Sequence, residues 1–133
     1  MKNFYSCVDA LIPSPLSEQH LIIKNKAEKE KGSITAYASE EFRTIKSQPW
    51  ILIKMKETPD LDGVVFFTAQ QFSYGSRFNL KLFNRLLDNN YEVHFAREDF
   101  SFKKEDLNTM NLDFLISNSL VFQRDENDLI EII

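Results

Sequence analysis

Two carboxylates and one imidazole have the chemistry and the placement for acid–base catalysis. Glu40 and Glu98 each follow a predicted strand, and His20 lies in the first turns of a predicted helix. Groups of this kind that converge can exchange protons with a bound substrate. The alternatives are ordinary surface carboxylates and a packed, hydrogen-bonded His20, which its place in an apolar stripe favours. We name Glu40, Glu98 and His20 as the candidate catalytic residues.

Amide, guanidinium and hydroxyl groups near the same strand ends could recognise a ligand. The amides of Gln19 and Gln70 suit hydroxyl groups, whereas Arg77 and Arg97 can bind a phosphate or a carboxylate in a bidentate manner. Arg77 also begins a predicted helix, whose N-terminus favours an anion. The candidate ligand-binding residues are Tyr5, Ser6, Gln19, Gln70, Arg77 and Arg97.

The other potentially reactive side chains, Cys7 and His94, are more readily explained by structural roles than by catalytic ones. Cys7 is the single cysteine, and its thiol is either a nucleophile activated near helix N-termini or an inert buried group, which is the favoured alternative. His94 lies mid-strand between Val93 and Phe95 and is interpreted as structural. The sequence has neither a Gly-rich dinucleotide motif nor a P-loop. No cofactor and no metal are therefore predicted.

A strand–helix pattern must position these side chains, and its centre is residues 62–98. The first strand there is continuously apolar, as expected of a strand buried on both faces. Asn89-Asn90 ends the following helix with residues that tolerate the left-handed conformation. The elements are a strand over residues 63–68, a turn over 69–76, a helix over 77–89 and a strand over 92–96. The two strands are expected to be parallel, with a right-handed crossover.

The flanking sequence extends the pattern on both sides. Ser14-Pro15 predicts a helix start, with Ser14 as N-cap, and Gly32 predicts its end. The preceding loop carries Leu11 and Ile12, two apolar residues that look exposed. The other predicted elements are strands over residues 3–8 and 33–38, a helix over 47–56, a loop over 97–101 and at least one helix within 102–123.

The predicted fold class is α/β. We expect a small doubly wound, mainly parallel four-stranded sheet with helices on both faces, either flavodoxin-like or resolvase-like. Residues 1–123 form the single domain, and residues 124–133 are a C-terminal tail that docks, adds an edge strand or contacts a partner. Ligands bind outside the carboxyl ends of parallel strands. The segments expected there are residues 5–9, 39–43, 68–77 and 96–99.

Length and composition exclude several classes of protein. A chain of 133 residues is long enough for one domain with a substantial core. A net charge of −4, from 16 basic and 20 acidic residues, predicts neither a nucleic-acid nor an anionic-membrane surface. One cysteine excludes an intramolecular disulfide and favours the reducing cytoplasm. We find neither an apolar run of membrane-span length nor a signal-peptide core.

Short motifs together resemble the bacterial sporadic carbohydrate cluster protein family. The resemblance spans roughly residues 4 to 100, and it departs from the family at Ser6-Cys7, where the family has a Ser-Arg pair. The missing arginine argues against anion binding by that loop. The matching positions are Pro15, Gln19 and Ile23 in a helix start, residues 39–41 with their glutamates, residues 62–65 (Asp-Gly-Val-Val) and residues 94–98 (His-Phe-Ala-Arg-Glu).

Residues 62–98 are also similar in pattern to the catalytic core of serine recombinases, with Gly75-Ser76-Arg77 in the loop position. Those enzymes need a serine nucleophile in a Tyr-x-Arg-x-Ser segment. Residues 5–9 here read Tyr-Ser-Cys-Val-Asp and lack both the arginine and that serine. Recombination is therefore not expected, because shared architecture does not transfer function.

Three functions follow as hypotheses. The first, which the carbohydrate-cluster resemblance implies, is a cytoplasmic protein of surface-carbohydrate biosynthesis that binds, and in one version processes, a small polar or phosphorylated sugar at the strand ends. The alternative is a non-catalytic interaction module that assembles, for example as a homo-oligomer, through the tail and the loop with Leu11 and Ile12. The third is an inactive relic of the recombinase fold, in which no polar groups converge at the strand ends.

Overall fold

A five-stranded, mainly parallel sheet lies at the centre of the computed structural model, which describes residues 1–38, 48–74, 77–106 and 113. The strands are β1 (Lys2–Cys7), β2 (Gly32–Tyr37), β3 (Gly63–Phe66), β6 (Glu92–Phe95) and β7 (Phe100–Phe102). Their order is β2-β1-β3-β6-β7. The first four are parallel and β7 is antiparallel to β6. The predicted α/β class and mainly parallel sheet are confirmed, and the sheet has one strand more than expected.

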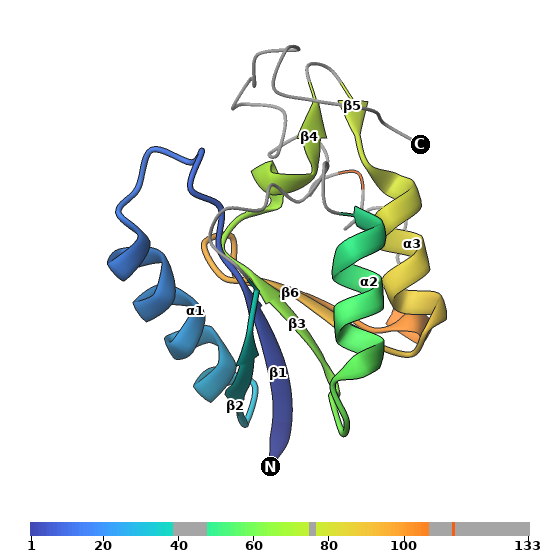
Figure 1. Ribbon diagram of the computed structural model, residues 1–133. Coiled ribbons are helices and arrows are strands. Elements are labelled where there is room, and N and C mark those ends of the chain that lie inside the picture. Colours follow the sequence, from blue (N-terminus) through green and yellow to red (C-terminus); the bar gives the residue numbers. More distant parts are fainter. Residues whose placement is uncertain (39–47, 75–76, 107–112, 114–133) are drawn as a thin grey trace.

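Helices lie against both faces of this sheet (Figure 1). One face carries α1 (Leu16–Lys29), and the other carries α2 (Gln48–Glu57) and α3 (Leu80–Asp88). Successive side chains of a strand point to opposite faces. Val64 and Phe66 of β3 accordingly join the core under α2 and α3, whereas Val65 joins the core under α1. Burial on both faces explains why the strand is continuously apolar.

The segments around α1 differ in detail from the prediction. The N-cap of α1 is Pro15, without a side-chain hydrogen bond, instead of Ser14. Lys31, with φ 62°, makes the turn after the helix. Gly32 instead begins β2, where a Cβ atom would clash with the ring of Phe4. Ile12, expected to look outward, is buried in the core under α1.

A short hairpin replaces the end of the predicted turn and the start of the helix predicted over residues 77–89. After β3 the chain forms a 3-10 turn, η1 (Ala69–Phe72), and then the antiparallel pair β4 (Ser73–Tyr74) and β5 (Arg77–Phe78). Helix α3 starts at Leu80, because the Asn79 side chain caps it by accepting a hydrogen bond from the Leu82 backbone N–H at 3.1 Å. Arg77 therefore lies in a strand, and the helix N-terminus expected beside it is absent at that position.

Strand β7 replaces the end of a predicted loop and the start of a predicted helix. The Phe102 ring packs edge-on against Phe83 at 5.2 Å and against Phe95 at 6.3 Å. These contacts bury an aromatic side chain on the sheet, which outweighs the local helical pattern. A 3-10 turn, η2 (Lys104–Asp106), follows. Except for residue 113, the rest of the predicted helix lies outside the described residues, as does the tail over residues 124–133.

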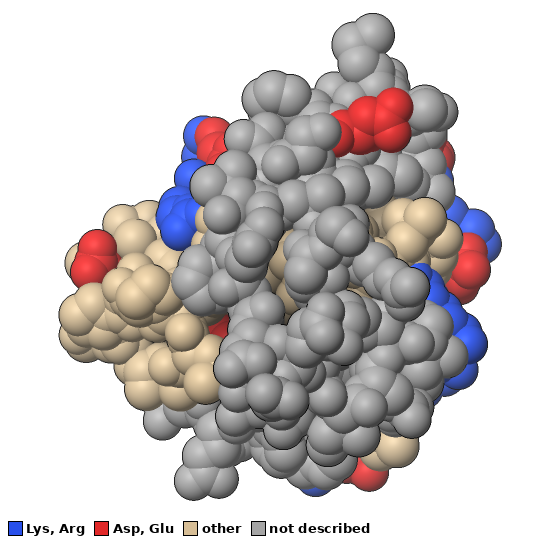
Figure 2. Space-filling model, turned by 90° about the horizontal axis from the view of Figure 1, so that it is seen from above, with Lys and Arg blue, Asp and Glu red and all other residues tan. Residues whose placement is uncertain are grey.

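The described surface is mixed in charge. Seen from the end at which the parallel strands finish, basic and acidic residues occur in separate small groups instead of one patch of a single sign (Figure 2). None of the described helices combines the length and the hydropathy that crossing a membrane requires.

Candidate functional site

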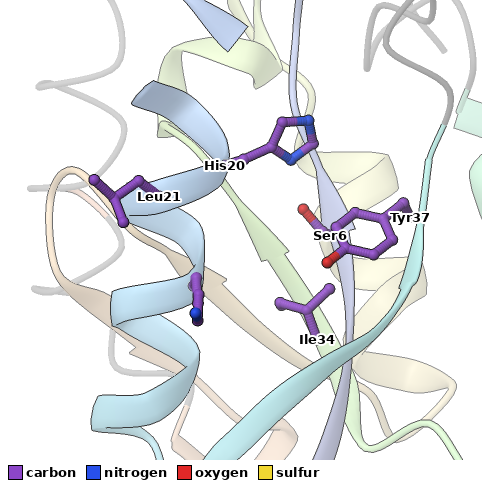
Figure 3. Close-up of a pocket in the computed structure, with 6 residues that line it drawn as sticks. Ser6, His20, Leu21, Ile34 and Tyr37 are labelled. Atoms are coloured by element: carbon purple, nitrogen blue, oxygen red, sulfur yellow. The ribbon is translucent and has the colours of Figure 1, made fainter. Parts of the chain in front are cut away.

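A cavity of about 400 Å³ lies between α1 and the strands β1 and β2 (Figure 3). This volume is within the range that holds small molecules. Figure 3 shows the ring of His20 reaching from α1 toward Ser6 and Tyr37 on the strands. The residues that line the cavity are Ser6, His20, Leu21, Lys24, Ile34 and Tyr37.

Ser6 brings a buried polar group into this cavity. Its neighbours Phe4 and Val8 on the same face of the sheet are packed in the core under α1, and Ser6 itself is 2% exposed. The Oγ atom forms no hydrogen bond with any residue that the structure describes. A buried hydroxyl without a partner costs about 1–3 kcal/mol. A polar group in this state at a cavity wall can complete its hydrogen bonds with a molecule in the cavity.

A bulge in the β1–β2 pairing gives the cavity its aromatic wall. Phe4 pairs with Ile34 but Tyr5 pairs with Ala36, so that β2 carries one extra residue, Thr35. Ile34 and Tyr37, three positions apart, consequently share one face, although simple alternation would separate them. Tyr37 is 63% exposed, and its ring lies edge-on to His20, with 5.8 Å between centroids.

Helix α1 supplies the other wall, and Gln19 fixes where that helix begins. The Gln19 amide accepts a hydrogen bond from the Asp9 backbone N–H and donates to the backbone oxygens of Asp9 and Ser14, all at 3.0 Å. Gln19 is fully buried. The structure thus places this predicted ligand-binding amide in the loop between β1 and α1, where it positions His20, the next residue.

The C-terminal half of α1 joins a polar network that the sequence did not indicate. The Lys26 ammonium, on a side chain only 4% exposed, lies 2.7 Å from Asp99 Oδ1 and 3.1 Å from Glu30 Oε2. It also donates to Ser101 Oγ at 2.9 Å. Lys29 forms a second ion pair with Asp99. These contacts hold the pKa of Asp99 at about 2, below its ordinary value of 3.8.

His94 continues this network through the sheet. Its Nε2 lies 2.9 Å from Glu92 Oε1, and its Nδ1 lies 2.9 Å from Ser101 Oγ. Burial lowers the pKa of His94 below its ordinary 6.5, although Glu92 acts in the opposite direction. In the neutral ring Nε2 must donate, because a carboxylate only accepts, and Nδ1 is then the acceptor. His94 is thus buried with both ring nitrogens hydrogen-bonded, which agrees with its interpretation as a structural residue.

Glu98 and Arg97 lie in the turn after β6 and bond to neighbouring segments. The Glu98 carboxylate accepts hydrogen bonds from Thr68 Oγ1 at 2.6 Å and from the Ala69 backbone N–H at 3.1 Å. It therefore already occupies the start of η1. The Arg97 guanidinium lies over the Phe67 ring, 5.9 Å from its centroid. This geometry is a cation–π contact.

The structure separates the remaining sequence-predicted residues. Tyr5 faces the core under α2 and α3, away from Ser6, and burial raises the pKa of its hydroxyl. Gln70 is buried in η1. Cys7 is also buried in the core with Tyr5. Glu40 and the side chain of Arg77 lie outside the described part of the chain.

Of the predicted site residues with described side chains, the structure brings Ser6 and His20 together at one cavity. Lys24 and Tyr37 were missed. Lys24 follows His20 by four residues, a spacing that places both on one helix face and could have indicated it. Tyr37 could not be assigned from alternation, because the bulge at Thr35 changes its face.

The described residues contain no group of three or more His, Cys, Asp and Glu side chains arranged to hold a metal ion. The arrangement at the cavity is therefore one of hydrogen-bonding groups, an aromatic ring and an ammonium. Comparison with protein-family models, curated proteins and solved structures finds no match to this chain.

Proposed function

We propose that this protein binds a small ligand of carbohydrate type in the cavity between α1, β1 and β2. The observation that carries the proposal is the buried Ser6 hydroxyl, which faces the cavity and bonds to none of the described residues. A sugar hydroxyl can both donate to and accept from such an oxygen. The ligand would then supply the hydrogen bond that the described residues do not provide.

Tyr37 supports a sugar over a purely polar ligand. A pyranose has a rim of hydroxyl groups and at least one face of C–H groups. The exposed Tyr37 ring can cover such a face and remove it from water. A ligand with one apolar face and a hydroxyl rim would match the ring and Ser6 at the same time.

The position of the cavity supports the same proposal. Ser6 and Tyr37 are paired near the carboxyl ends of β1 and β2, which is the end of a parallel sheet where ligands usually bind. The order β2-β1-β3-β6, with helices on both faces, supports a doubly wound, flavodoxin-like description of this part of the fold. We include that description in the proposal.

The family resemblance supports a cellular context of surface-carbohydrate biosynthesis in the cytoplasm. If the ligand is also processed, the step would run through His20, which lines the cavity. Glu98 is bound to Thr68 and Ala69 instead. Binding is the central proposal, and processing depends on it.

Calorimetric titration with glucose, galactose, mannose and N-acetylglucosamine tests the proposal. We expect at least one of them to bind, and Ser6→Ala to weaken that binding about fivefold, the value of one hydrogen bond. Ser17→Ala is the matched control, because Ser17 is exposed on α1. Absence of binding by all four sugars, or equal affinities of wild type and Ser6→Ala, would contradict the proposal.

A second candidate function is the non-catalytic interaction module. It is favoured by two exposed apolar side chains beside the cavity, Leu21 at 57% and Tyr37 at 63%. Light scattering separates the two functions. Self-association that is lost in a Leu21→Ser, Tyr37→Ser double variant would support assembly through this surface, and a monomer at all concentrations would count against a homo-oligomer.

A further inference from the structure

Three lysines on α1 differ in what surrounds their ammonium groups. Lys26 and Lys29 are committed to Asp99, and Lys26 also to Glu30. Lys24 lines the cavity and forms no ion pair with any described residue. An ammonium that no described carboxylate pairs with can interact with a ligand in the cavity that it lines. The ammonium groups of Lys26 and Lys29 are already paired.

The lining of the cavity has a positive charge and no described carboxylate to balance it. The lining side chains apart from Lys24 are a serine, a histidine, a tyrosine and two aliphatic residues. His20 and Lys24 lie one helical turn apart, about 6 Å along the axis. A ligand held by Ser6 would therefore lie in a cavity that is also lined by the cationic Lys24 side chain.

The type of cation indicates the type of anion. Arginine is favoured where a planar carboxylate is bound in a bidentate manner, whereas lysine acts as a point charge and commonly binds phosphate. No arginine is among the described residues that line the cavity. On this chemistry a phosphate ester fits the site better than a sugar acid does.

We propose that the ligand of this cavity is a phosphorylated sugar, with Lys24 binding its phosphate group. This inference rests on the proposed function, because the sugar ring must lie in the cavity against both Ser6 and Tyr37. Lys24 is exposed to solvent, so the attraction is partly screened and weakens as salt is added.

Calorimetric titrations with glucose, galactose and mannose, their 1- and 6-phosphates and inorganic phosphate test the assignment. We expect at least one ester to bind the wild type about tenfold more tightly than its neutral sugar, as a hydrogen bond to a charged group implies. Lys24→Gln should remove this difference, because it should weaken binding of the ester about tenfold more than binding of the neutral sugar. Lys24→Arg, which keeps the charge, should retain most of the difference.

Lys56→Gln is the matched control, since Lys56 is exposed on α2 on the opposite side of the sheet and forms no ion pair with the described residues. It should leave every affinity unchanged, and all variants should show the wild-type unfolding midpoint. Esters that bind no more tightly than neutral sugars, or a difference that survives in Lys24→Gln, would overturn the assignment to Lys24 and leave the proposed function standing. Binding of inorganic phosphate as tight as that of the esters would overturn the sugar component. If neither sugars nor esters bind, both proposals fail.

Discussion

Helix α1 presents polar groups to two regions of the structure, which differ in how well those groups are satisfied. In the first region, Lys26 is nearly enclosed and reaches Asp99, Glu30 and Ser101 within 3.1 Å. In the second region, at the cavity, the Ser6 hydroxyl and the Lys24 ammonium have no hydrogen-bond or ion-pair partner among the described residues. The first region is saturated with hydrogen bonds, whereas the cavity region is not saturated by the described part of the chain.

This difference separates stability from binding. A buried charge stabilises a fold only where its partners replace the water that it has lost. The Lys26 network meets this condition and joins α1 to the turn between β6 and β7. The Ser6 hydroxyl does not meet it, so its burial costs stability unless a ligand completes its hydrogen bonds. We therefore attribute the first region to the architecture, and the proposed ligand site lies in the second.

The largest predicted effect is that of Lys26→Met. The substitution keeps the packed side-chain stem but removes the Lys26 ammonium from Glu30 and Asp99, so that Asp99 keeps its ion pair with Lys29. We expect the free energy of unfolding, measured by urea denaturation, to fall by about 2 kcal/mol. This is less than the ~3–5 kcal/mol of a fully buried pair, because the carboxylates are partly exposed.

Lys24→Met is the matched control on the same helix. It should change the free energy of unfolding by less than about 0.5 kcal/mol, as is usual for an exposed side chain, and Lys24 has no ion-pair partner among the described residues. Equal losses in the Lys26 and Lys24 variants would refute the distinction between the Lys26 region and the cavity region.

Much of the architecture could be predicted from sequence, because its signals are local. Three of these signals depend only on nearby residues. They are the apolar run over β3, the helical spacing of Leu82, Phe83, Leu86 and Leu87, and the Asn89-Asn90 pair that ends this helix. The structure buries all four of these helix residues and places Asn90 at φ 64°. The parallel arrangement followed from these elements.

The features that were missed depend on residues far apart in the chain. Strand β7 forms because Phe102 packs against Phe83 and Phe95. The face of Tyr37 depends on a bulge opposite Phe4 and Tyr5, and neither the bulge nor its position has a sequence signal. Whether a lysine is paired also depends on long-range geometry, which is why Lys24 and Lys26 looked alike.

Serine-to-alanine substitutions, one in the Lys26 network and one at the cavity, should have smaller effects on the free energy of unfolding. Ser101→Ala removes an oxygen that accepts from Lys26 and bonds to His94, both at 2.9 Å, and should cost about 1 kcal/mol of unfolding free energy. Ser6→Ala removes a hydroxyl without a described partner and should be neutral or slightly stabilising. Chemical denaturation of both variants without ligand measures this difference. A similar loss of unfolding free energy in Ser101→Ala and Ser6→Ala would contradict it.

The stability that the network around Lys26 and His94 provides should also depend on pH. Burial holds the pKa of His94 below its ordinary 6.5, so the unfolded chain takes up this proton first as the pH falls. The free energy of unfolding should therefore decrease as the pH is lowered from 7.5 through 6.5 to 5. The free energy of unfolding, measured by denaturation at each pH, should depend less steeply on pH in His94→Asn than in wild type. An equally steep dependence in that variant would assign the effect to other groups.

The claim that Ser6 is kept for a ligand is tested most directly by the gain in unfolding free energy that a bound sugar confers on wild type and on Ser6→Ala. Ligand that binds the folded state stabilises it in proportion to the logarithm of its concentration over Kd. The sugars to be tested are glucose, galactose, mannose and their phosphates. For each of them that binds, we predict that the free energy of unfolding rises more in wild type than in the variant at every concentration. Equal gains in the two proteins, together with a Ser6→Ala variant less stable than wild type in the absence of sugar, would contradict the claim and make Ser6 a structural residue.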